Sequence, residues 1–217
     1  AAPIPASPTF SEPSPASACG CFAWPRGFIL TPAVLVKVAT ASGLLPVFQR
    51  AEAALLSGDG ARARLAGHEA AAALRGVELG EGLTASIAKR HAALIRGPVM
   101  DGGEVRGDVV LAVRSSALDE DGLQHSHAGQ YSSLLNVHSL DSVLGAVREV
   151  WASWFSERAI GYRLHCLRER GGLLSGDTER GDPLTSVPRM SVIIQRMVAA
   201  RCSGMLFTAH PVTGNRE

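Results

Sequence analysis

Apolar residues recur at two different spacings along the chain, and the spacing separates expected helices from expected strands. Over residues 47–75 and 83–96, Ala and Leu return every three to four positions between Arg and other polar residues, which predicts helices with one buried side. Glycines at positions 58, 60, 80 and 82 interrupt this pattern. We therefore expect two or three helices on the outside of a core.

The longest helical pattern covers residues 139–170. Its apolar stripe runs from Leu140 to Phe155 at intervals of three and four residues, which predicts one helix packed against the core. Ser139 or Asp141 is the expected start, because a short polar side chain at the N-cap can accept a hydrogen bond from a free backbone N–H.

Short apolar runs between the helical segments predict strands. The run DVVLAVRSS is β-branched and apolar until it becomes polar at Arg114. A polar stretch rich in Gly and Pro, residues 171–188, is the expected loop insertion. Strands that alternate with helices, with polar residues at strand ends, indicate an α/β or α+β ligand-binding domain. The expected strands cover residues 108–116, 131–137, 189–198 and 202–214.

The most apolar part of the chain covers residues 28–48, within the segment 25–48. PRGFILT predicts a short strand entering a helix, with Thr31 as N-cap and Pro32 at the first helical position. The stretch 28–48 is long enough to cross a bilayer, but Pro32, Lys37 and Pro46 interrupt it. We interpret it as a strand, a turn and a buried helix, and we expect no membrane partner.

Residues 1–24 differ in composition from the rest. The first 18 consist largely of Ala, Pro and Ser, which cannot bury enough apolar surface to offset the entropy of ordering, so we expect a disordered arm followed by a domain over residues 25–217. A plastid transit peptide would have a similar Ser-rich, acid-poor character, but only Arg26 lies nearby. The cytoplasm is therefore the expected compartment, with a plastid as the alternative.

Charge and cysteine content narrow the function classes. The formal net charge is +1 and 19% of residues are charged, so nucleic acid is not an expected partner. The four cysteines form no CxxC pair, and the CxC of Cys19 and Cys21 is too little for a four-ligand zinc site without distant histidines. We expect free thiols and no metal site built from these cysteines.

Arg114 is the most informative residue for chemistry. It lies where an apolar strand meets a loop, and two serines follow it. The planar fork of guanidinium donors suits a phosphate or a carboxylate ligand. The alternative is an ion pair with Asp119, Glu120 or Asp121, which follow closely in the sequence.

Two further positions could meet a ligand. Gly129 lies in the turn HAGQYSS, where the absence of a side chain would let main-chain N–H groups approach a phosphate, although most such turns are simple hairpins. Gln195 is an amide within an apolar strand, so it must satisfy its hydrogen bonds inside the protein or on a ligand.

Several motifs in a fixed order resemble a known family. VRSSA, a Glu-Asp pair, SxAGQ, LNV, EVWASWFSERAIGYR, VIIQRMV and SGMLFTAHPVTG follow one another at spacings similar to those of the nucleotide-binding domain of the phosphoenolpyruvate synthase and pyruvate phosphate dikinase family. PRGFILT resembles the proline-glycine-phenylalanine strand near the start of that domain. The resemblance covers residues 25–217 and is tightest over 109–165 and 190–216.

This resemblance implies an ATP-grasp-like α/β (α+β) fold, here its N-terminal part with an incomplete second subdomain, that holds ATP and Mg²⁺. Arg114 would contact the ATP phosphates and act in catalysis. Gly129 and the segment at Ser133 and Leu134 would cover the phosphates, with Ser133 where relatives usually have threonine. Gln195 would lie in the strand beside the adenine, and the main chain near Met197 would read the base.

The family's chemistry implies further domains. A phosphoryl group passes from ATP to a histidine on a swivelling domain, which carries it to pyruvate or another acceptor. We expect that phosphohistidine domain and the acceptor domain, together with the ligands of Mg²⁺, to lie beyond the end of this chain, which would then be inactive alone.

Two departures from the family pattern matter. Relatives have a glycine-lysine signature before the first strand, and its lysine contacts ATP, whereas SPASACGCFAW contains no lysine. The missing lysine keeps open a non-catalytic alternative, in which the chain is a binding module or pseudoenzyme fragment. His127 invites comparison with the phosphorylated histidine, but it falls where relatives usually have phenylalanine, so we expect a loop or packing residue.

Overall fold

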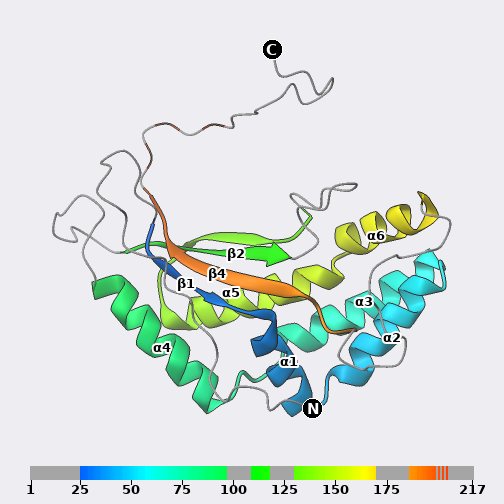
Figure 1. The fold of residues 1–217 in the computed structure, drawn as a ribbon, viewed down its shortest axis with the longest axis horizontal. Coiled ribbons are helices and arrows are strands. Elements are labelled where there is room, and N and C mark those ends of the chain that lie inside the picture. The colour runs from blue at the N-terminus through cyan, green and yellow to red at the C-terminus, as the bar shows by residue number, and fades with distance from the viewer. Residues whose placement is uncertain are drawn as a thin grey trace.

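The computed structural model describes residues 25–96, 109–117, 130–169 and 186–198, together with 200, 202 and 204 (Figure 1). The expected arm over 1–24, the turn at Gly129, His127 and most of the expected strand over 202–214 lie outside these residues. In chain order the elements are β1 (Gly27–Leu30), α1 (Pro32–Ala41), α2 (Leu45–Leu56), α3 (Gly60–Arg75), α4 (Glu81–Arg96), β2 (Leu111–Ala117), β3 (Ser133–Val137), α5 (Leu140–Ala152), the 3₁₀ turn η1 (Ser153–Phe155), α6 (Glu157–Glu169) and β4 (Met190–Arg196).

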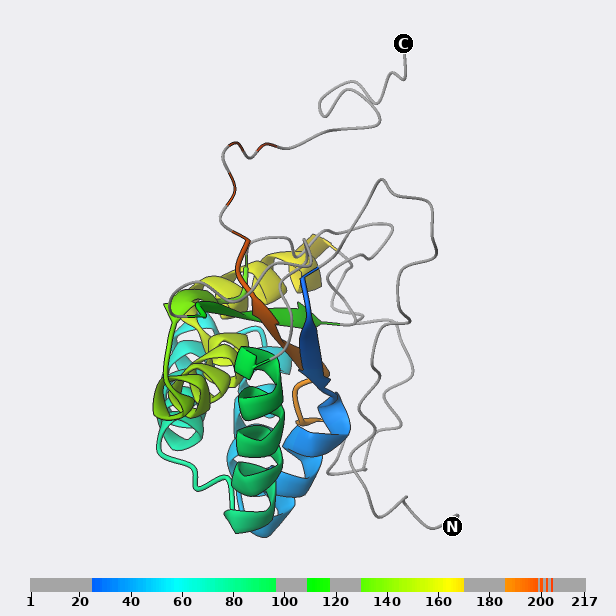
Figure 2. The ribbon, with the colours of Figure 1, turned by 90° about the vertical axis from the view of Figure 1, so that its left-hand side faces the viewer.

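The described strands form one antiparallel sheet in the order β1-β4-β2-β3. Burial alternates along β4, where Met190, Val192, Ile194 and Arg196 are buried and the residues between them are partly exposed. Helices α1, α3, α4 and α5 lie on the side of the buried residues (Figures 1 and 2). The mixture of a sheet with helices on one face confirms the expected α+β, ATP-grasp-like class.

The opposite side of the sheet has no described helix packed against it, and we call it the outer face. Because partners across a sheet point to the same side, the register assigns its residues. They are Gly27 and Ile29 of β1, Ala112, Arg114 and Ser116 of β2, Ser133 of β3, and Ser191, Ile193 and Gln195 of β4.

The helices between β1 and β2 follow the glycine pattern of the sequence. Gly58 and Gly80 adopt φ values of 74° and 75°, which favour glycine, and each precedes the start of a helix. Thr31 is the N-cap of α1 and Pro32 begins it, as predicted, but the threonine hydroxyl makes no capping bond.

The prediction of one long helix over residues 139–170 is wrong, because the segment forms α5, η1 and α6. Ser139 does cap α5, through a reciprocal capping box with Ser142. The helix ends at Ala152, because the Ser153 hydroxyl donates to the Val150 carbonyl at 2.7 Å and the chain becomes extended at Ser156, with ψ of 153°. Ser156 then accepts the N–H of Ala159 and begins α6.

The described part of the chain holds no single helix that is long and apolar enough to span a bilayer. Helices α1 and α2 reach that length and hydropathy only when they are taken together, and they are bent by 114°.

Gly27 allows β1 to pair closely with β4. A Cβ atom added there would lie 2.5 Å from the Ile194 carbonyl oxygen and 2.8 Å from the Gln195 Cβ. Since one of these atoms belongs to backbone, β1 would have to move. We expect Gly27→Ala to lower the free energy of unfolding by about 1–3 kcal/mol in urea denaturation.

Gly145→Ala is the matched control for this substitution. Gly145 lies on the exposed side of α5 with no atom near its missing Cβ, so alanine should raise stability by about 0.5–1 kcal/mol. Equal effects of the two substitutions would contradict the close approach of β1 to β4.

Candidate functional site

Arg114 lies on the outer face between two neighbours. Its Cα pairs with Ser133 of β3 on one side and with Ile193 of β4 on the other. The residue is exposed, and no described side chain forms a hydrogen bond or ion pair with its guanidinium. Directly opposed residues of antiparallel strands have Cα atoms about 4.5–5.5 Å apart, so the guanidinium and the Ser133 hydroxyl can reach one ligand. The alternative partners Asp119, Glu120 and Asp121 lie outside the described residues.

Gln195 lies on the same face, diagonally across from Arg114. It pairs with Ala112 and with Gly27, and diagonal neighbours in a sheet are about 7–8 Å apart. Its two cross-strand neighbours are small, since Ala112 carries only a methyl group and Gly27 has no side chain. The structure therefore brings together Arg114, Ser133 and Gln195 of the predicted site residues.

Met197 follows the end of β4 and is already partly engaged. Its N–H donates to the Val110 carbonyl at 2.9 Å, and its thioether sulfur accepts the N–H of Asn136 at 3.2 Å. A base contact from Met197 would therefore have to use its main-chain carbonyl or the side of its thioether.

Leu134 faces away from the other predicted residues. It pairs with Val113, which is fully buried, and it packs against the hydrophobic core. Only its main chain can take part in a site on the outer face.

Arg196 is a buried cation below the candidate site that the sequence pattern did not single out. It is buried on the helix side, and its guanidinium donates to the Leu94 carbonyl, with 2.7 Å from Nε. Burial lowers the pKa of Arg196, and the positive charge of Arg26 lowers it further. The bond fastens the last turn of α4 beneath the strand that carries Gln195. An arginine in phase with the buried positions of VIIQRM was the available signal.

The described residues do not form a metal centre. They contain no group of three or more His, Cys, Asp or Glu side chains that could hold an ion. Among them, Cys166 is a buried free thiol and Cys202 an exposed one.

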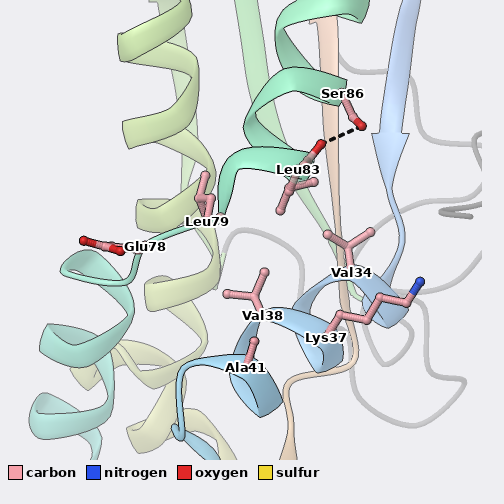
Figure 3. Close-up of a pocket in the computed structure, with 10 residues that line it drawn as sticks. Val34, Lys37, Val38, Ala41, Glu78, Leu79, Leu83 and Ser86 are labelled. Carbon is pink, nitrogen blue, oxygen red and sulfur yellow. Dashed lines mark hydrogen bonds between the residues drawn. The ribbon is translucent and has the colours of Figure 1, made fainter.

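A pocket of about 290 Å³ lies between α1 and α4, and it contains none of the predicted site residues. Figure 3 shows Val38 and Leu83 in its middle, with Lys37 and Glu78 on opposite sides. An apolar lining offers a triphosphate too few partners to replace its hydration. The outer face, with an exposed guanidinium and hydroxyls, fits an anion better.

Comparison with known proteins gives a consistent result. A family model described as "Pyruvate phosphate dikinase, AMP/ATP-binding domain" matches residues 19–217. A probable phosphoenolpyruvate synthase of Methanothermobacter thermautotrophicus is 33% identical over 190 residues, 88% of this chain and 25% of that protein.

Two relatives of other activities also match. A rifampicin phosphotransferase of Bacillus subtilis is 41% identical over 106 residues, 49% of this chain and 10% of its own. A prodigiosin synthesizing transferase of Serratia marcescens is 41% identical over 105 residues, 48% of this chain and 10% of its own. The chain thus spans a quarter or less of the length of these three proteins.

The face assignment of β3 can be tested through stability. Leu134→Ala should lower the free energy of unfolding by about 2 kcal/mol, because it removes apolar contacts with the core. Its neighbour Ser133 is exposed, so Ser133→Ala should change stability by less than about 0.5 kcal/mol. Urea denaturation of both variants measures these changes. A larger loss of unfolding free energy for Ser133→Ala than for Leu134→Ala would contradict the assignment of the two faces.

Proposed function

The chain belongs to the pyruvate phosphate dikinase AMP/ATP-binding domain family, and from that premise we propose that it binds ATP across the outer face of its sheet. Arg114 contacts the phosphates, Ser133 and the main chain of Leu134 cover them, and Gln195 lies on the adenine side. Gly129 would complete the cover over the phosphates, and the Met197 carbonyl would meet the base.

One observation carries the proposal: the register sets Arg114 directly opposite Ser133 and one diagonal step from Gln195. A guanidinium and a hydroxyl can bind the phosphates of a nucleoside triphosphate, and an amide can bind its base. Phosphoryl transfer asks little covalent chemistry of a protein and depends on positioning and on stabilising charge. Arg114 serves both needs, since its fixed fork can hold a phosphate while charge develops on the transferred group.

The activity we propose is that of an ATP-dependent phosphotransferase of the phosphoenolpyruvate synthase type. The phosphoryl group would move to a histidine on a further domain and then to pyruvate or a related acceptor. The matched relatives are named as a probable phosphoenolpyruvate synthase and a rifampicin phosphotransferase, and these names support the reaction class rather than one acceptor. Mg²⁺ would accompany the ATP phosphates, since this ion is usually held by phosphate oxygens together with one or two carboxylates.

A second function is a non-catalytic binding module on the same scaffold. The observation in its favour is the absence of lysine from residues 14–24, where the family's ATP-contacting lysine is expected. Such a module would keep adenine recognition through Gln195 and lose affinity for the triphosphate.

Arg114→Ala tests the phosphate assignment. We expect wild type to bind ATP with a Kd in the high micromolar range and the variant to bind at least about tenfold more weakly, since a charge-assisted hydrogen bond is lost. Adenosine affinity should not change. The measurement is an NMR titration with ATP, with magnesium present, and a second one with adenosine.

Arg62→Ala is the control, because Arg62 is an exposed arginine that lies in helix α3 and not in the sheet. Sub-micromolar ATP binding by wild type, or equal ATP affinity for Arg114→Ala and Arg62→Ala, would refute the site assignment.

Gln195→Leu tests the adenine side separately. Leucine keeps the size of the side chain and removes its amide, so adenosine and ATP should both bind about three- to tenfold more weakly. Inorganic tripolyphosphate should bind as it does to wild type. A variant that loses tripolyphosphate instead would place the phosphates, and not the base, against Gln195.

A further inference from the structure

The segment SWFSERAIGYR, residues 153–163, has no role in the nucleotide site as proposed above. It spans η1 and the first half of α6, at some distance along the chain from every predicted site residue. Its polar and aromatic side chains nevertheless converge on residues 130–132, which lead directly into Ser133.

Arg158 holds the first of these residues. Its Nε and Nη2 atoms donate to the Gln130 carbonyl at 3.2 and 3.0 Å. The guanidinium therefore uses two donors on one main-chain oxygen. The Oε1 atom of the Gln130 side chain is buried and has no hydrogen-bond partner among the described residues.

Trp154 and Ser153 hold the next two residues. The rings of Tyr131 and Trp154 stack with centroids 5.4 Å apart and planes inclined by 2°. The Ser132 N–H donates to the Ser153 hydroxyl at 3.1 Å, and that hydroxyl donates in turn to the Val150 carbonyl. Three successive residues are thus each held by one side chain, and we call Ser153, Trp154 and Arg158 the clamp.

The clamp is itself braced from the helix layer. The Arg163 guanidinium lies 5.2 Å from the centroid of the Trp154 ring, a cation–π contact. Arg163 also pairs with Glu52 of α2 at 2.8 Å, and both side chains are largely buried, at 14% and 23% exposed. Trp154 is therefore connected to α2 through Arg163, which restricts the position of its ring.

We propose that the clamp is a positioning device for ATP: it fixes residues 130–132 so that the Ser133 hydroxyl and N–H meet the phosphates held by Arg114. This inference rests on the proposed function. Arg158 is a positioning residue and touches no ligand. Small displacements of binding groups have large effects on phosphoryl transfer, which explains why one short strand end receives three separate contacts.

Arg158→Ala in the full 217-residue chain is the test. Amide exchange at Ser132 and Ser133 should accelerate at least about tenfold, because a hydrogen-bonded carbonyl next to them is released. In NMR titrations ATP and tripolyphosphate should bind about five- to tenfold more weakly, while adenosine binds as it does to wild type. Arg158→Lys should recover part of the loss, since it keeps one donor.

Arg168→Ala is the control, because Arg168 is an exposed arginine near the end of the same helix. It should leave amide exchange, ATP affinity and melting temperature unchanged, the last to within about 2 °C.

The outcomes separate this inference from the function beneath it. If Arg158→Ala behaves as Arg168→Ala does, or loses adenosine as strongly as ATP, the clamp is structural only and the inference is overturned, while the nucleotide site stands. If wild type binds no ATP, or if Arg114→Ala binds ATP with the affinity of wild type, the proposed function fails and the inference fails with it.

Discussion

The pairing of β2 with β4 is the constraint on which the structure depends. Seven consecutive residue pairs join the two strands, from Leu111 with Arg196 to Ala117 with Met190. Because side chains alternate, a slip of one residue would send Arg114 into the core and Val113 to the surface. Burial of Val113, Val192 and Ile194 beneath the helices therefore fixes the register, and the register in turn places the guanidinium on the outer face.

The two faces of the sheet differ in the side chains they carry. The inner side supplies stability, through apolar side chains packed against α5 and the fully buried Trp151. The outer side carries polar groups, among them Arg114, Ser133 and Gln195. Arg196 is the exception: a charged side chain on the inner side, retained because it satisfies a carbonyl in the last turn of α4. Chemistry on one face thus depends on packing on the other.

Local patterns in the sequence predicted the strands within the described residues and the helix starts at Pro32 and Ser139. They placed Arg114 at the end of a strand, whereas it is the fourth of the seven residues of β2, because Ser115, Ser116 and Ala117 continue the pairing with β4. They failed at Ser153, because the apolar stripe continues through Trp154 and Phe155 while the backbone leaves the helix. They could not reveal that the Met197 N–H donates to the Val110 carbonyl, or that the Arg158 guanidinium donates to the Gln130 carbonyl. Such contacts join residues far apart in the chain, and periodicity contains no information about them. The expectation of a nucleotide ligand came from the family resemblance. The face of the sheet on which Arg114 lies could be assigned only from the strand register.

Mapping ATP onto backbone amides by NMR tests the central claim most directly. In a ¹⁵N-labelled chain, added ATP should shift the amide signals of Arg114, Ser133 and Gln195, on three strands of one face, and leave those of Val38 and Leu83 unchanged. Shifts confined to Val38 and Leu83 would place the ligand in the apolar pocket between α1 and α4 and contradict the account. Shifts confined to residues of the outer face would support the claim that the register of β2 creates the nucleotide site.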